Sequence, residues 1–169
     1  MAAEDNSVEV IREHIRKRTE ARDEKFLFGA ERVDLKRVSN LKFEARKRQF
    51  TFYIDEPPDR GGTDQGPNPL AYFIAGAASC LMNQYAVLAT STDLPLDDME
   101  LTARGHFDRR IGGAFEEVVY DLRLKSIASK EAILHLSKEA EKMCYAHATL
   151  KRAGVKVQTN LFLNGTQIS

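Results

Sequence analysis

The sequence lacks a charge excess, a set of cysteines and a long apolar leader, and each lack excludes a class of protein. Lysine plus arginine and aspartate plus glutamate number 25 each, which argues against a general nucleic-acid partner. Two cysteines in 169 residues are no disulfide scaffold, so they are either buried small side chains or reactive thiols. Without a signal peptide or a run long enough to cross a bilayer, we expect a cytoplasmic protein with no membrane partner.

Several cofactor and catalytic motifs are also absent. The loop of residues 55–68, DEPPDRGGTDQGPN, has no Gly-Lys-Ser/Thr ending and no G-x-G-x-x-G, so its glycines are expected to serve turns. No G-x-S-x-G marks a serine hydrolase. His135 and Glu139 share a helix face, as do Cys144 and His147, but no further ligands stand at zinc spacing. We expect neither a metal nor a cofactor, and we expect His147 to be a hydrogen-bonded core or interface histidine.

The most apolar stretch is residues 66–89, GPNPLAYFIAGAASCLMNQYAVLA. Asn68 is a good N-cap, and Pro69 suits the first position of a helix. No charge occurs between residues 70 and 82, which predicts a helix buried on all sides. Cys80 lies in the middle of this helix, beside small residues that allow another backbone to approach closely.

The remaining periodicity predicts an α+β fold with antiparallel sheet. Apolar and polar residues alternate, as in half-buried strands, over residues 32–56, 99–107, 118–125 and 155–163. Helical spacing predicts one helix from Ser7 to about Lys25 and another from Ser129 to Arg152. Gly154 suits the C-terminal cap of the second helix.

Arg37 is the one cation that strand alternation places beside inward apolar residues, Val33 and Leu35. An arginine on an inward face needs a partner, because an unpaired buried charge is very costly. Either Arg37 has such a partner, or the strand has already bent and the side chain is solvated.

The two cysteines lie on different predicted helices. If the helices pack together, the thiols of Cys80 and Cys144 can approach within disulfide range. A thiol among apolar side chains is unreactive unless a cation stabilises its thiolate, and Arg37 would supply that cation. Such a thiolate could attack a peroxide, become a sulfenic acid and close a disulfide with the second thiol. The alternative is two buried, unreactive cysteines.

Residues 55–89, DEPPDRGGTDQGPNPLAYFIAGAASCLMNQYAVLA, resemble the signature of the OsmC/Ohr superfamily of osmotically induced protein C and organic hydroperoxide resistance proteins. In that family a glycine-rich loop ends in a proline, and a buried helix carries a cysteine eleven positions later, as Pro69 and Cys80 do here. The segment AEKMCYAHATL resembles the family's second cysteine segment at Cys144. We therefore interpret residues 29–169 as an OsmC-like domain and residues 1–28 as an N-terminal helical extension.

The resemblance implies an intertwined homodimer, with two antiparallel sheets wrapped around central helices, and thiol peroxidase activity towards organic hydroperoxides. It implies that Cys80 is the peroxidatic thiol, Cys144 the resolving thiol and Arg37 the thiolate-stabilising arginine, with Arg46 as the alternative. A dithiol reductant, such as a lipoyl group or a small thiol, would reopen the disulfide.

The chain departs from the family's peroxidases in two places. They carry a glutamate just after the proline, where this chain has Leu70-Ala71, so Glu44 or Glu56 would have to replace it. Their second cysteine is usually followed by proline, and here Tyr145 follows it. These departures favour the broader OsmC-like branch. They leave open a non-catalytic protein that binds a hydrophobic small molecule, or a scaffold protein that binds a partner through its N-terminal helix.

Overall fold

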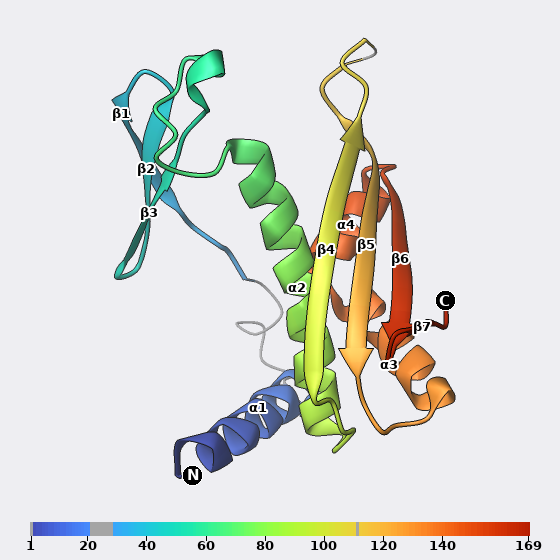
Figure 1. Cartoon of the computed structure of the whole chain (residues 1–169). Helices are drawn as coiled ribbons and strands as arrows, with labels where there is room; N and C mark the ends of the chain where they lie inside the picture. The colour runs from blue at the N-terminus through green and yellow to red at the C-terminus, as the bar shows by residue number, and fades with distance from the viewer. Residues whose placement is uncertain (1, 21–28, 111) are drawn as a thin grey trace. The chain divides into compact units, whose positions relative to one another are not determined.

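The computed structural model describes residues 2–20, 29–110 and 112–169. In the first of these ranges, side chains are described for residues 8–17 only. The chain divides into two compact units, one of Met1–Glu20 with Gly76–Ser169 and one of Ala21–Ala75. Each unit contains one β-sheet (Figure 1). The boundary between the units falls within helix α2 (Pro69–Ser91).

The sheet of the smaller unit has the strand order β1-β2-β3, with antiparallel neighbours. The strands are β1 (Asp34–Ser39), β2 (Lys42–Lys47) and β3 (Phe50–Ile54). Asn40 and Arg48 have positive φ angles of 35° and 54° in the two hairpin turns. The predicted strands and the predicted bends are thus confirmed.

One face of this sheet is apolar. The register aligns two rows of side chains across it: Leu35, Ala45 and Phe52, and Arg37, Phe43 and Ile54. Ala45 is fully buried, whereas Leu35 is 58% exposed, so the face is only partly covered. Because the register holds as far as Arg37, this residue lies on the apolar face as predicted. Every residue of β1 is nevertheless exposed, so the Arg37 side chain is solvated rather than buried.

Helix α2 begins as the sequence predicts but is buried on one face only. The side-chain oxygen of Asn68 accepts a hydrogen bond from the Ala71 N–H at 2.8 Å, and Pro69 is the first helical residue. The buried residues are Ala77, Ala78, Leu81, Gln84, Tyr85 and Ala89. Gly76 and Ser79 are exposed, so the prediction of burial on all sides is wrong. Apolar composition alone does not distinguish burial within one chain from burial between two chains.

The length of α2 bears on the expectation that no run is long enough to cross a bilayer. Among the described residues it is the one helix of 23 residues that is apolar enough to cross a membrane. The core helix of a soluble protein meets the same criteria, and 33% of the apolar window of α2 is buried within the chain. The helix therefore gives only weak evidence for a membrane segment.

The sheet of the larger unit has the order β4-β5-β6-β7. Its strands are β4 (Asp98–Phe107), β5 (Phe115–Lys125), β6 (Lys156–Leu163) and β7 (Thr166–Gln167). The α+β fold is confirmed, but this sheet is mixed, because β5 and β6 are parallel. A helical crossover joins these two strands and returns the chain to the end of the sheet at which β5 began. Parallel strands need such a crossover, because a tight hairpin joins only antiparallel strands.

Two helices form that crossover, α3 (Lys130–Met143) and α4 (Tyr145–Arg152), and they lie behind the sheet in the view of Figure 1. The sequence predicts a single helix here, and that prediction is wrong at Cys144, whose backbone is extended (φ −78°, ψ 113°). The apolar spacing continues across the break, so periodicity does not detect it. The start is as predicted, since Ser129 Oγ accepts a hydrogen bond from the Ala132 N–H at 3.2 Å.

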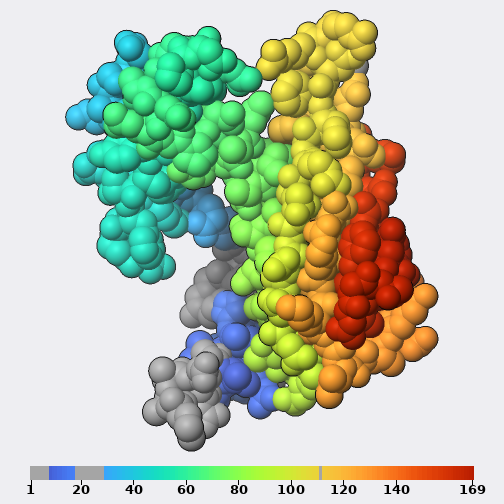
Figure 2. All heavy atoms as spheres, in the orientation of Figure 1, coloured from blue at the N-terminus to red at the C-terminus, as the bar shows by residue number. Residues whose placement is uncertain are grey.

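The core of the larger unit lies between the helices and the inner face of its sheet. Its fully or nearly fully buried residues include Val118, Tyr120, Leu122, Leu124, Ile133, Leu136, Ala140 and Leu161. The outer face of β4, β5 and β6 is turned toward the viewer in Figure 2 (yellow, orange and red). It carries ion pairs such as Arg104–Asp121 at 2.6 Å and Lys156–Glu117 at 2.6 Å.

Helix α1 spans Ala2–Glu20, so it begins before Ser7, which the sequence predicts as its cap. The predicted end near Lys25 lies outside the described residues. Arg12 of α1 forms an ion pair with Asp93, two residues beyond the end of α2.

Candidate functional site

Two thiols from different helices meet inside the larger unit. Cys80, in the middle of α2, is partly exposed, and Cys144, between α3 and α4, is fully buried. Their Sγ atoms lie 3.4 Å apart, with the Cys144 thiol donating toward the Cys80 sulfur. A disulfide bond is about 2.05 Å long, so both residues are free thiols. Their sulfur atoms would have to move only a little more than about 1 Å closer to form that bond.

Cys144 also caps the helix that follows it. Its sulfur accepts a hydrogen bond from the His147 N–H at 3.4 Å, in the manner of an N-cap side chain. Burial, with a smaller contribution from Cys80, raises the pKa of the Cys144 thiol to about 11, although the hydrogen bond from the His147 N–H acts in the opposite direction. Cys144 is therefore a protonated thiol near neutral pH.

Further polar side chains of this unit are buried without a hydrogen-bond partner among the described residues. They are Gln84 (Oε1), Tyr120 (hydroxyl), His147 (both ring nitrogens) and Thr159 (Oγ1). Gln84 follows Cys80 by four residues, so the two share a helix face. Tyr120 and Thr159 are paired neighbours on β5 and β6. The core around the thiols is thus more polar than its aliphatic strand pattern suggests.

His147 is buried as predicted, but it is not a hydrogen-bonded histidine among the described residues. Burial lowers its pKa, and Glu141, whose carboxylate lies 3.9 Å from the ring, opposes this effect. The imidazole is consequently neutral near pH 7.

The two candidate arginines lie on opposite faces of the first sheet. Arg37 is on the apolar face and donates from Nε to the Asn40 carbonyl at 2.8 Å. Arg46 is on the other face, where its guanidinium lies 2.7 Å from the Glu44 carboxylate. Both arginines belong to the smaller unit, whereas both thiols belong to the larger one.

The two carboxylates considered as replacements for the family glutamate differ in their contacts, since Glu56 Oε2 is buried without a hydrogen-bond partner among the described residues. Glu44 pairs with Arg46, and the Glu56 carboxylate lies 3.6 Å from the Arg60 guanidinium. Leu70, at the position of the missing carboxylate, is 45% exposed at the start of α2.

The loop before α2 is organised by a buried aspartate. Asp55 is fully buried, and its carboxylate accepts hydrogen bonds from the Thr63 hydroxyl at 2.6 Å and from the N–H groups of Glu56, Thr63 and Gln65. The Thr63 hydroxyl is the main cause that holds the pKa of Asp55 below its ordinary value. The loop thus has a defined conformation where it leads into the cysteine helix.

Two glycines of this loop permit close backbone approach rather than simple turns. A Cβ on Gly62 would lie 1.7 Å from the Glu56 carbonyl oxygen, and one on Gly66 would lie 2.2 Å from that of Tyr53. The sequence-based interpretation as turn glycines is therefore incomplete.

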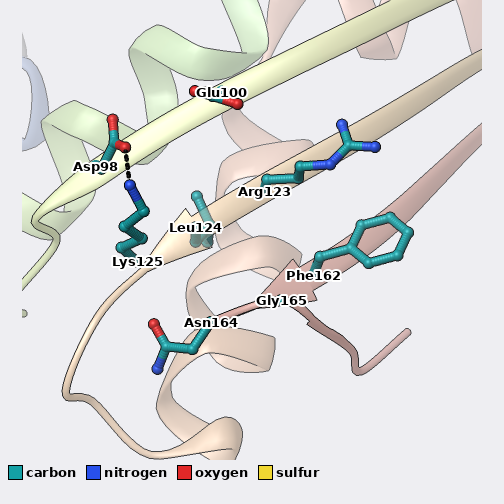
Figure 3. A pocket seen from close by; sticks show the side chains of 8 residues that line it. All are labelled: Asp98, Glu100, Arg123, Leu124, Lys125, Phe162, Asn164 and Gly165. Carbon is teal, nitrogen blue, oxygen red and sulfur yellow. Dashed lines mark hydrogen bonds and ion pairs between the residues drawn. The ribbon is translucent and has the colours of Figure 1, made fainter.

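A separate hollow of about 460 Å³ lies on the outer face of the second sheet (Figure 3). It is lined by charged and aromatic side chains, among them the Lys125–Asp98 ion pair at 2.8 Å and Arg123 over the Phe162 ring at 5.3 Å. Neither cysteine lines this hollow. Within the described part of the chain, no three His, Cys, Asp or Glu side chains are grouped to hold a metal ion.

Sequence reasoning selects the two thiols but misses Gln84 and Tyr120. The spacing of Gln84 from Cys80 was a usable signal, because residues four apart share a helix face. Tyr120 occupies an inward position of a strand that is otherwise aliphatic there, and its hydroxyl was the available signal.

A protein-family model described as OsmC-like protein matches residues 62–160, a range that contains both cysteines and Tyr120. No functionally curated protein matches the chain.

Solved structures share the fold at low sequence identity. An OsmC-like protein from Mycoplasma pneumoniae is 21% identical with a TM-score of 0.67, over 79% of this chain and 97% of that one. An organic hydroperoxide resistance protein OsmC from Legionella pneumophila is 18% identical with a TM-score of 0.61, over 77% and 94%. The organic hydroperoxide resistance protein OhrB of Bacillus subtilis is 24% identical with a TM-score of 0.55, over 82% and 99%.

Proposed function

This chain belongs to the OsmC-like protein family, and from that premise we propose that it is a cysteine-based peroxidase that reduces organic hydroperoxides. The observation that carries the proposal is the 3.4 Å separation of the Cys80 and Cys144 sulfurs. Structural neighbours that bear the name organic hydroperoxide resistance protein support the same chemistry.

The roles of the two thiols follow from their different surroundings. Cys80 is partly exposed, so a peroxide can reach it, whereas Cys144 is fully buried. The thiolate of Cys80 attacks the terminal hydroxyl oxygen of the hydroperoxide, so an S–O bond forms as the O–O bond breaks. The alkoxide that leaves takes up a proton and becomes an alcohol. The products of this step are a sulfenic acid on Cys80 and the alcohol.

The second step forms a disulfide between Cys80 and Cys144, so both thiols must later be regenerated by a reductant. The Cys144 sulfur attacks the sulfenic sulfur of Cys80, and the hydroxyl leaves with the Cys144 proton as water. Burial suits Cys144 to this role, because its raised pKa keeps it as an unreactive thiol until the sulfenic acid forms beside it. An external dithiol, such as a lipoyl group, then reduces the disulfide by thiol–disulfide exchange and becomes a cyclic disulfide itself.

Arg37 is the cation that we assign to the thiolate. Its place on the apolar face of the first sheet is the supporting observation. The family's glutamate has no counterpart at Leu70-Ala71, so the arginine acts without that orienting carboxylate.

We also propose that the working form is an intertwined homodimer. The exposed face of α2, with Gly76 and Ser79, and the half-covered apolar face of the first sheet, with Leu35, are the surfaces that a second copy would cover. Sedimentation analysis tests this idea: Ser79→Arg would give a monomer, and Thr102→Arg, on the exposed outer face of β4, would not. A wild-type monomer at micromolar concentration would refute the dimer.

A count of free thiols tests the peroxidase. The reduced protein is mixed with cumene hydroperoxide or with hydrogen peroxide, and the remaining thiols are titrated against time. We expect rapid loss of both thiols with the organic hydroperoxide and slower loss with hydrogen peroxide. Thiols that survive an excess of the organic hydroperoxide would refute the peroxidase. They would favour the alternative, a non-catalytic protein that binds a hydrophobic small molecule.

A further inference from the structure

Two tyrosines are fully buried in the core of the larger unit, and they differ in one respect. The hydroxyl of Tyr85 donates to Ser137 Oγ at 2.7 Å. The hydroxyl of Tyr120 has no hydrogen-bond partner among the described residues. A buried hydroxyl without a partner lowers stability, because it has lost its bonds to water and gained nothing in return. Such a group needs a reason to be a tyrosine rather than a phenylalanine.

The position of Tyr120 supplies that reason. It lies on the inner face of β5, in the layer between the sheet and the helices, where Cys144 is also fully buried. Burial, with smaller contributions from Cys144 and Cys80, raises the pKa of the Tyr120 phenol to about 12. The phenol is therefore protonated near neutral pH, so its hydroxyl can donate a hydrogen bond.

Extending the proposed function, we infer that Tyr120 is a positioning residue whose hydroxyl donates a hydrogen bond to the anion that forms on the Cys80–Cys144 pair. In the resting dithiol neither sulfur is a hydrogen-bond partner of this hydroxyl. A thiolate, or the sulfenate oxygen that extends from Cys80, is a far better acceptor than a neutral thiol. A donor that is buried and unpaired beforehand costs little to reorganise when the charge appears.

This role and a purely structural role make opposite predictions for Tyr120→Phe. The substitution removes only the oxygen and keeps the ring. If the hydroxyl serves the thiols, its loss removes an unpaired buried polar group, so the melting temperature stays the same or rises. Reactivity of the thiols falls, because their anion has lost a donor. A structural hydroxyl would instead lower the melting temperature and leave thiol reactivity unchanged.

The test is the pH profile of Cys80 alkylation by monobromobimane in the reduced full-length protein, with the modified residue located by peptide mass spectrometry. We expect the half-maximal pH to rise by about one unit in Tyr120→Phe, which lowers the rate at pH 7 by about tenfold. The matched control is Tyr85→Phe, which loses the bond to Ser137. It should lower the melting temperature and leave the alkylation profile as in the wild type.

The outcomes separate this inference from the proposed function. An alkylation profile of Tyr120→Phe that coincides with the wild-type profile overturns the role of Tyr120, whatever the peroxide results. The same holds if Tyr85→Phe shifts the profile equally, because the effect is then not specific. If the wild-type thiols do not react with cumene hydroperoxide but the alkylation profile of Tyr120→Phe shifts, the proposed peroxidase activity is refuted. The role of Tyr120 at the thiol pair is then still supported.

Discussion

The Sγ atom of Cys144 lies 3.4 Å from that of Cys80, although 64 residues separate the two cysteines in the chain. The helical crossover between β5 and β6 breaks at Cys144, and the thiol that the break frees also caps α4. Cys144 therefore caps a helix and, in the proposed peroxidase, resolves the sulfenic acid, and these two roles can be tested separately.

The chemical roles predict different outcomes for the two serine variants. Cys80→Ser should abolish consumption of cumene hydroperoxide, because no peroxidatic thiol remains. Cys144→Ser should still react once and then hold a sulfenic acid on Cys80, which dimedone labels and mass spectrometry locates. Equal residual turnover in both variants, or dimedone labelling at Cys144 in Cys80→Ser, would contradict this assignment.

The capping role predicts a difference in stability between two variants at Cys144. Serine can accept the His147 N–H in place of the thiol, whereas alanine cannot. We expect Cys144→Ala to unfold in urea with a free energy about 1 kcal/mol lower than that of Cys144→Ser.

The matched control is the same pair of substitutions at Cys80, which lies inside α2 and caps no helix. There the alanine variant should be at least as stable as the serine variant, since alanine is the better helix former. A Cys144→Ala variant as stable as Cys144→Ser would show that the thiol does not act as a cap.

The buried carboxylate of Asp55 makes stability depend on pH. The Thr63 hydroxyl, followed by the N–H groups of Gln65, Glu56 and Thr63, lowers its pKa from the ordinary 3.8. Because the folded pKa lies below the unfolded one, this stabilisation is complete above about pH 4 and is lost as the pH falls through the folded value.

Asp55→Asn replaces one carboxylate oxygen, a hydrogen-bond acceptor, with an NH₂ group that can only donate. That group would face the N–H and hydroxyl donors that now bind the carboxylate. We expect this variant to be less stable than the wild type at pH 7, with a gap that narrows as the pH falls toward 3. Urea unfolding across this range measures it. Asp59→Asn, on the exposed 3₁₀ turn of the same loop, is the control and should follow the wild type. A gap that does not change with pH would count against the role of the charge.

The glycine at position 62 predicts a steric effect. Any Cβ there would lie 1.7 Å from the Glu56 carbonyl oxygen. This oxygen belongs to the backbone, so it cannot relieve the clash by a change of rotamer as a side chain could. Gly62→Ala should therefore lower the free energy of unfolding by about 3 kcal/mol. Gly113→Ala, where a Cβ meets no atom of the described residues within 4 Å, should change it by less than about 0.5 kcal/mol. Similar urea midpoints for both variants would refute the close approach.

Local patterns were sufficient for much of the fold. Asn68 and Pro69 predict the start of α2 because capping depends on a few neighbouring residues. Period-two alternation predicts the three strands of the first sheet and places Arg37 on its apolar face, because that period follows from strand geometry itself. The identity of Cys80 and Cys144 as the candidate thiols also came from the sequence.

Tertiary packing decided what no local pattern contains. The break at Cys144 interrupts an apolar stripe that continues on both sides, so its position depends on how α3 and α4 pack. The parallel pairing of β5 and β6 depends on where the crossover returns. The 3.4 Å contact of the sulfurs and the unpaired hydroxyl of Tyr120 are relations between side chains distant in sequence. The sequence by itself determined which side chains could react. Packing of the helices on the sheet decided which of these side chains lie in contact, because periodicity describes only neighbours along one helix or strand.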